Sequence, residues 1–205
     1  MIKNIVFDAG DVLVRWKPHE VLASEVADPA ARDIIYDNFF GSELWWHMDR
    51  GDMTRAEMLE KAVANLPQYE RELRQLMAVW PNYATRNDDT VAFMRELKER
   101  HGLGVYILSN WSDNCREISS LHPAVEIANG VMFSSEVHLA KPEKAIFDLF
   151  CKKFGVRADE CLFTDDTPRN VEGARAAGWQ GELFTDAESL RRSLIARGVI
   201  REKNG

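Results

Sequence analysis

The sequence predicts an α/β fold in which a Rossmann-like parallel β-sheet is interrupted by an all-helical insertion. From about residue 87 onward, short apolar runs alternate with amphipathic helix patterns, as in βαβ units. Residues 15–86 instead hold four of the six tryptophans, few strand-like runs and helix signals throughout. We therefore expect residues 1–14 and 87–205 to form the α/β core, and residues 15–86 to form a helical cap.

The first element is a short apolar strand, residues 5–7, which stops at Asp8. A tight polar loop follows, from Asp8 to Asp11. Strands of a parallel sheet that is covered on both faces are apolar throughout. Ligands of such sheets bind in the crevice beyond the carboxyl ends of the strands. Asp8 is therefore the first candidate for a functional residue.

Two helices of the insertion have clear start signals. Asp28 followed by Pro29 is typical of an N-cap before a proline in the first turn. Thr54 with Glu57 three residues later forms a capping box. One face of the second helix is apolar; it consists of Met58, Ala62 and Leu66.

After the insertion, strand and helix patterns alternate to the end of the chain. Strands are expected at Val105–Leu108, Val131–Phe133, Cys161–Thr164 and Glu182–Phe184. Helices are expected to start at Asp88-Asp89, Pro142, Thr167-Pro168 and Asp186. The first three should end near Gly102, Gly155 and Gly178. Their apolar residues recur at helical spacing, namely Val91, Met94 and Leu97; Ile146, Leu149, Phe150 and Phe154; Val171 and Ala174; and Leu190, Leu194 and Ile195.

Composition excludes some classes of function. With 33 acidic and 26 basic residues the formal charge is −7, which gives no support to nucleic-acid or membrane binding. No apolar run approaches the roughly 20 residues that cross a bilayer, and no leader precedes the first strand. The three cysteines fit no metal motif, and we expect Cys151 and Cys161 to be buried. These features predict a cytoplasmic protein in a reducing compartment; they do not predict its oligomeric state.

Three later segments carry polar groups that the predicted sheet would bring toward Asp8. They contribute Ser109 and Asn110 after one strand, Lys141 before a helix, and Asp165 and Asp166 after another strand. Carboxylates gathered there would suit Mg²⁺, the lysine would neutralise charge on a ligand, and the serine and asparagine would cradle an anion. The simpler interpretation is a surface lysine, a solvated Asp165, and plain caps at the other positions.

In order along the chain, these segments resemble the four motifs of the haloacid dehalogenase superfamily. The matching stretches are Phe-Asp-Ala-Gly-Asp-Val-Leu-Val around Asp8, Leu-Ser-Asn at Ser109, Lys-Pro at Lys141, and Asp-Asp-Thr-Pro-Arg-Asn at 165–170. The helical insertion resembles the C1 cap of that superfamily. The overall pattern is similar to small bacterial sugar-phosphate phosphatases of the glucose-1-phosphate phosphatase kind.

The resemblance implies a reaction and a role for each motif. Asp8 would attack the substrate phosphorus and form an aspartyl-phosphate, which water then hydrolyses, while Ser109 and Lys141 would hold the phosphoryl oxygens. Mg²⁺ would be bound by the Asp8 carboxylate, the Gly10 carbonyl and Asp166, with support from Asp165 and Asn170. The implied partner is a small phosphorylated metabolite. The alternatives are a haloacid dehalogenase that uses the same aspartate without metal, and a non-catalytic binding protein.

One position departs from the usual phosphatase pattern of the family. A second aspartate, the general acid and base, normally lies two residues after the nucleophile, and here that position is Gly10. Asp11, one residue further on, is either a displaced general acid or a turn residue, and we favour the turn because aspartate is common in tight turns.

The cap contains a second candidate cluster, Trp45-Trp46-His47-Met48-Asp49. Adjacent tryptophans of a helix point in different directions, so at least one of the two is expected in the core. The other, with His47, is a candidate for lining the substrate side of a pocket.

Overall fold

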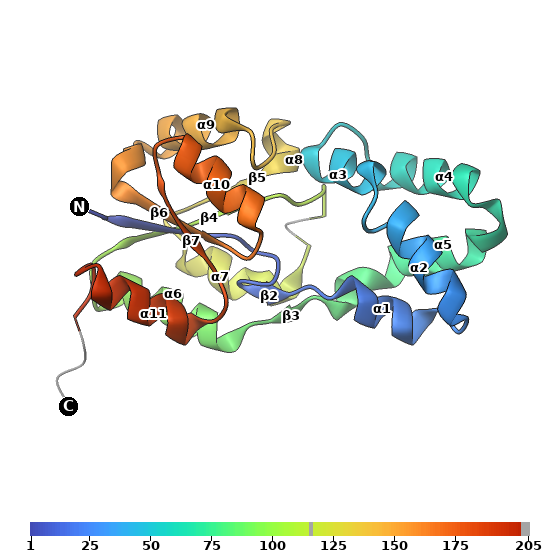
Figure 1. The fold of residues 1–205 in the computed structure, drawn as a ribbon, viewed down its shortest axis with the longest axis horizontal. Helices are drawn as coiled ribbons and strands as arrows, with labels where there is room; N and C mark the ends of the chain where they lie inside the picture. Colours follow the sequence, from blue (N-terminus) through green and yellow to red (C-terminus); the bar gives the residue numbers. More distant parts are fainter. Residues whose placement is uncertain (115–116, 202–205) are drawn as a thin grey trace.

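The computed structural model describes residues 1–114 and 117–201, so Cys115 lies outside the described residues. Its core is a five-stranded parallel sheet in the order β5-β4-β1-β6-β7 (Figure 1). The strands are β1 (Asn4–Phe7), β4 (Gly104–Ser109), β5 (Gly130–Phe133), β6 (Cys161–Asp165) and β7 (Gln180–Leu183). This sheet confirms the predicted α/β class.

Helices cover both faces of the sheet (Figure 1). One face carries α6 (Asp88–Glu99), α7 (His122–Ile127) and α11 (Ala187–Ala196), and the other carries α9 (Lys144–Phe154) and α10 (Pro168–Ala176). Side chains of β1 alternate between the two apolar clusters: Ile5 and Phe7 belong to one, and Val6 to the other. Burial of both faces explains why the strands are apolar throughout.

The insertion consists of five α-helices beside the carboxyl edge of the sheet (Figure 1). They are α1 (Pro18–Glu25), α2 (Pro29–Asn38), α3 (Glu43–Arg50), α4 (Arg55–Asn65) and α5 (Glu70–Val79). The chain enters and leaves this unit through an antiparallel ribbon of β2 (Val14–Arg15) and β3 (Thr85–Arg86). We call the segment between these strands the cap; the proposed boundary of core and cap, 15–86, falls at the ribbon.

Most local signals in the sequence have the predicted structural effect. Asp28 caps α2 by accepting from the Ala30 amide, and Asp186 caps α11 by accepting from the Ser189 amide. Thr54 and Glu57 form the full capping box of α4. Cys161 is buried as expected, whereas Cys151 is only half-buried.

Several predicted boundaries were wrong by one or two residues. Asn87 is the N-cap of α6, and Asp88 and Asp89 lie in its first turn. The helix expected from Pro142 begins at Lys144, because a turn closes first from the Glu143 amide to the Ala140 carbonyl. The last strand, predicted at 182–184, lies at 180–183. Its position follows from its pairing with β6 and not from its own apolar residues. Among the described residues, no helix is long and apolar enough to cross a membrane.

Candidate functional site

The candidate site lies at the carboxyl edge of the three central strands. In the order β4-β1-β6, the register aligns Phe7 with Ile107 on one side and with Thr164 on the other. Asp8 follows β1, Ser109 ends β4 and Asp165 ends β6, so adjacent strands deliver all three side chains to one place. Lys141 enters from the loop between α8 (Ser134–Val137) and α9.

Lys141 is a buried cation held between two carboxylates. Its Nζ lies 2.8 Å from Asp8 Oδ1 and 2.6 Å from Asp165 Oδ2. The side chain is about 1% exposed, which rules out the surface-lysine interpretation. Burial alone would lower the pKa of the ammonium, but the charges of Asp165 and Asp8 outweigh it and raise the pKa. Lys141 therefore stays charged at neutral pH.

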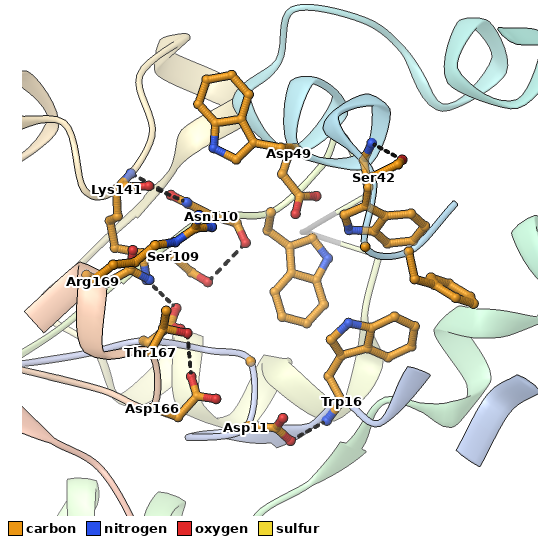
Figure 2. A pocket seen from close by; sticks show the side chains of 18 of the residues that line it. Asp11, Trp16, Ser42, Asp49, Ser109, Asn110, Lys141, Asp166, Thr167 and Arg169 are labelled. Carbon is orange, nitrogen blue, oxygen red and sulfur yellow. Dashed lines mark hydrogen bonds and ion pairs between the residues drawn. The ribbon is translucent and has the colours of Figure 1, made fainter. Parts of the chain in front are cut away.

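The two adjacent aspartates differ in environment, and the burial of Asp165 excludes the simpler interpretation in which it is solvated. Asp165 is fully buried and accepts bonds from the Thr167 amide at 2.8 Å and the Asn170 Nδ2 at 3.1 Å. With Lys141 these donors engage both of its carboxylate oxygens. Asp166 is exposed toward the cavity (Figure 2). It is the carboxylate of this pair that has room for a further ligand.

The carboxylates form a group that suits a divalent cation. Oxygens of Asp8, Asp165 and Asp166 lie within 4.8 Å of one another. Burial raises the pKa of Asp8 to about 7, with Lys141 opposing and the charge of Asp165 adding to the rise. Burial and the neighbouring charges of Asp165 and Asp11 also raise the pKa of Asp166. The single positive charge of Lys141 does not balance the three carboxylates. Mg²⁺ prefers a few carboxylates and keeps several waters, so it fits this donor set.

Ser109 and Asn110 both lie at the site but do different things. The Ser109 hydroxyl is almost fully buried and bonds to the Asp8 carboxylate, which lowers the pKa of Asp8. The Asn110 side chain forms two bonds with the Lys141 backbone: its Nδ2 donates to the carbonyl at 2.9 Å and its Oδ1 accepts from the amide at 2.8 Å. Asn110 therefore positions the loop that carries Lys141.

A cavity of about 630 Å³ opens between the sheet edge and the cap (Figure 2). The core side contributes the polar groups described above, together with Gly10 and Arg169. The cap side carries five aromatic residues, which are Trp16, Phe40, Trp45, Trp46 and Trp80. The polar residues Ser42, Glu43, His47 and Asp49 line the same wall. Trp45 is nearly buried and also packs in the core of the cap, whereas Trp46 is more exposed. Both tryptophans of the predicted cluster therefore border the pocket.

Asp11 has the local geometry of a turn residue. Its φ is +52°, in the left-handed region that aspartate tolerates in turns. The Oδ1 atom accepts from the Trp16 amide at 2.9 Å and pairs with the Lys17 Nζ at 3.0 Å. These bonds tie the side chain to the start of the cap, although it also borders the cavity.

Asp49 is the last residue of the predicted cap cluster, but the sequence indicated no role for it. It lies on α3 and its carboxyl group points into the cavity (Figure 2). The side chain accepts from the Trp45 side chain and from the Ser112 backbone amide. Its position four residues after Trp45 places both on one helix face, and that spacing was the available signal.

Comparison with known proteins places the chain among hydrolases. The family model described as haloacid dehalogenase-like hydrolase matches residues 2–178. A drimenol cyclase of Aspergillus calidoustus is 24% identical over 95% of this chain, but the chain spans only 36% of that relative. A D-ribitol-5-phosphate phosphatase of Bacteroides thetaiotaomicron is 25% identical over 88% of this chain and 90% of its own length.

Solved structures share the fold. One is a HAD family enzyme of Bacteroides thetaiotaomicron in complex with magnesium and inorganic phosphate, with a TM-score of 0.70 and 21% identity; the alignment covers 90% of this chain and 95% of that one. Another is an L-2-haloacid dehalogenase of Xanthobacter autotrophicus with chloropropionic acid covalently bound, with a TM-score of 0.67 and 23% identity; the alignment covers 98% and 85%. At these identities the likeness concerns the fold alone.

Proposed function

The chain belongs to the haloacid dehalogenase-like hydrolase family, and on that premise we propose that it is a magnesium-dependent phosphatase of small phosphorylated metabolites. The observation that carries this proposal is the arrangement around Asp8: a carboxylate 2.8 Å from a buried lysine and grouped with two further carboxylates. The relative described as a D-ribitol-5-phosphate phosphatase supports a sugar-phosphate type of substrate. We further propose that the protein is cytoplasmic. We also propose that it binds no nucleic acid, in keeping with its net charge of −7.

In the proposed reaction, an oxygen of Asp8 attacks the substrate phosphorus and the bond from phosphorus to the leaving oxygen breaks. The product is an aspartyl-phosphate on Asp8, which water hydrolyses to free phosphate. Splitting one difficult displacement into two easier steps is the advantage of a covalent nucleophile. Ser109 and Lys141 flank Asp8, so they are placed to hold the phosphoryl oxygens and neutralise their charge.

Mg²⁺ would be held by the Asp8 carboxylate, the Gly10 carbonyl and Asp166. Asp165 and Asn170 would support this site, since the bonds of Asp165 to Lys141 and Asn170 fix the carboxylates in place. When bound, the ion supplies the positive charge that lets several carboxylates and a phosphate share one site. The same carboxylates argue against the dehalogenase alternative, because without metal they would repel a carboxylate substrate.

Phosphate release from p-nitrophenyl phosphate and from a panel of phosphorylated metabolites tests the proposal. We expect activity with Mg²⁺, none after exhaustive chelation, and poor activity with Ca²⁺, which prefers more ligands and longer distances and would misplace Asp8. Full activity after chelation would contradict metal dependence. Halide release from a haloacid without metal would favour the dehalogenase, and metal binding without any turnover would favour a binding protein.

Asp11→Asn should affect good and poor leaving groups by similar small factors. Asp11 already bonds to the Trp16 amide and Lys17, so we expect it to shape the turn instead of donating a proton. The measurement compares kcat/KM for a sugar phosphate and for p-nitrophenyl phosphate. General acid catalysis is worth about 10²–10⁴-fold, so a large loss confined to the sugar phosphate would instead make Asp11 catalytic.

A further inference from the structure

The direction of attack decides which wall of the cavity meets the leaving group. In phosphoryl transfer the attacking and leaving oxygens lie roughly in line on opposite sides of phosphorus. Asp8 attacks from the sheet edge, so the leaving oxygen must face away from β1, toward the cap. On the core side, Gly10 offers no side chain, and a Cβ built there would meet no atom within 4 Å. Gly10 therefore cannot protonate the leaving oxygen, and the carboxylate of the next residue, Asp11, is already bonded to the Trp16 amide and to Lys17.

The cap brings two carboxyl groups to the cavity, the exposed Glu43 and the more enclosed Asp49. Asp49 is the candidate for this role. Figure 2 shows its side chain directed into the cavity from α3, opposite Asp166 and Asp11. Two donors, the Trp45 side chain and the Ser112 amide, hold the carboxyl group. Asp49 lines the same cavity as Asp8 and Lys141.

Contacts between cap and core hold Asp49 in a fixed position relative to the edge of the sheet. The Ser134 hydroxyl, at the start of α8, donates to the Asp49 carbonyl and accepts from the Trp111 amide at 2.9 Å. The next residue, Arg50, pairs with Glu143 of the core at 2.9 Å. Gly51 ends the helix at φ +85° and packs so closely on Ser135 that a Cβ would lie 2.6 Å from its carbonyl. Asp49 is thus attached to the core at the helix end.

The environment of Asp49 favours its protonated form. Enclosure by the cavity wall raises its pKa well above the ordinary value for an aspartate, and the charge of Asp8 raises it further. The bonds from Trp45 and Ser112 oppose this rise without cancelling it. A carboxyl group that holds its proton more tightly than an ordinary aspartate is suited to donate that proton to an alkoxide.

We propose that Asp49 is the general acid and base of this site, in the role that Gly10 cannot fill. This inference rests on the proposed phosphatase function. In the first step the bond from Asp8 to phosphorus forms, the bond to the leaving oxygen breaks, and the Asp49 proton moves to that oxygen. In the second step the Asp49 carboxylate takes a proton from water as the water oxygen bonds to phosphorus and the bond to Asp8 breaks. Asp49 is then protonated again.

The test compares two substrates of similar size that carry no hydroxyl groups. Benzyl phosphate has a poor alkoxide leaving group, whereas p-nitrophenyl phosphate has one that hardly needs a proton. For Asp49→Asn we expect kcat/KM to fall about 10²–10⁴-fold on benzyl phosphate and less than about tenfold on p-nitrophenyl phosphate. Because the second step also loses its base, the variant should release a burst of p-nitrophenol near one equivalent per site, followed by slow phosphate release.

Asp37→Asn is the matched control, since it makes the same change on an exposed residue of α2; it should leave both substrates unchanged. A fall of equal size on the two substrates, or no fall on either, would overturn the role of Asp49. If wild-type protein hydrolyses neither compound nor any phosphorylated metabolite, the proposed function itself has failed. Asp49→Ser provides a second variant with the same expected selectivity should the amide disturb the helix.

Discussion

Asp8→Asn should lower phosphatase activity by at least about a thousandfold, or about 4 kcal/mol of barrier, and leave the fold intact. Asparagine keeps the size of the side chain and loses the charge that attacks phosphorus. The measurement is kcat with Mg²⁺ on p-nitrophenyl phosphate, together with a thermal melt of the metal-free protein. Burial raises the pKa of Asp8 to about 7, so its ionisation opposes folding increasingly as pH rises from about 4 to 7. The variant should therefore melt at or above the wild-type temperature at neutral pH.

Measuring activity and melting temperature together distinguishes a catalytic role of Asp8 from a structural one. Asp37→Asn, on the cap surface, should retain both activity and melting temperature. Activity of Asp8→Asn within about tenfold of wild type, which is about 1.4 kcal/mol of barrier, would exclude the covalent mechanism. Loss of activity together with a large fall in melting temperature would show a structural role instead.

The fold was predictable because its signals are local. Apolar strands that stop on polar groups gave the parallel sheet, and capping residues such as Asp28, Thr54 and Asp186 gave helix starts that the structure confirms. The errors arose where neighbours in space decide the outcome. Pairing with β6 determines where β7 ends. The apolar pattern of residues 182–184 contains no information about this pairing.

The structure brings the candidate site residues together as expected, but the sequence did not predict their individual environments. Asp165 and Asp166 are adjacent in sequence, and no local pattern shows which one is buried; the lysine and Asn170 that surround Asp165 come from other segments. Lys141 has the local sequence of a surface residue and becomes buried only because β1 and β6 lie side by side. Asp49 reaches the cavity through the packing of α3 on α8, a contact between distant parts of the chain.

Lys141→Met should strongly destabilise the folded protein. The ammonium is the charge partner of both Asp8 and Asp165, at 2.8 Å and 2.6 Å. Methionine fills the space of the lysine stem but leaves two buried carboxylates facing each other. Removing one partner of a buried ion pair costs about 3–5 kcal/mol, and we expect a loss of this size in the free energy of unfolding, measured by urea denaturation without metal at about pH 8.

Two comparisons show whether lost charge, not altered packing, causes this loss. A proton bound by Asp8, whose pKa burial already raises to about 7, can replace part of the missing positive charge, so the deficit relative to wild type should be smaller at about pH 5. Adding Asp165→Asn to Lys141→Met removes one of the facing charges and should restore part of the stability, whereas the exposed Lys152→Met should change it by less than about 0.5 kcal/mol. A deficit that is independent of pH and unchanged in the double variant would mean that the Lys141 stem stabilises the fold through packing, and that Asp8 and Asp165 do not depend on its charge.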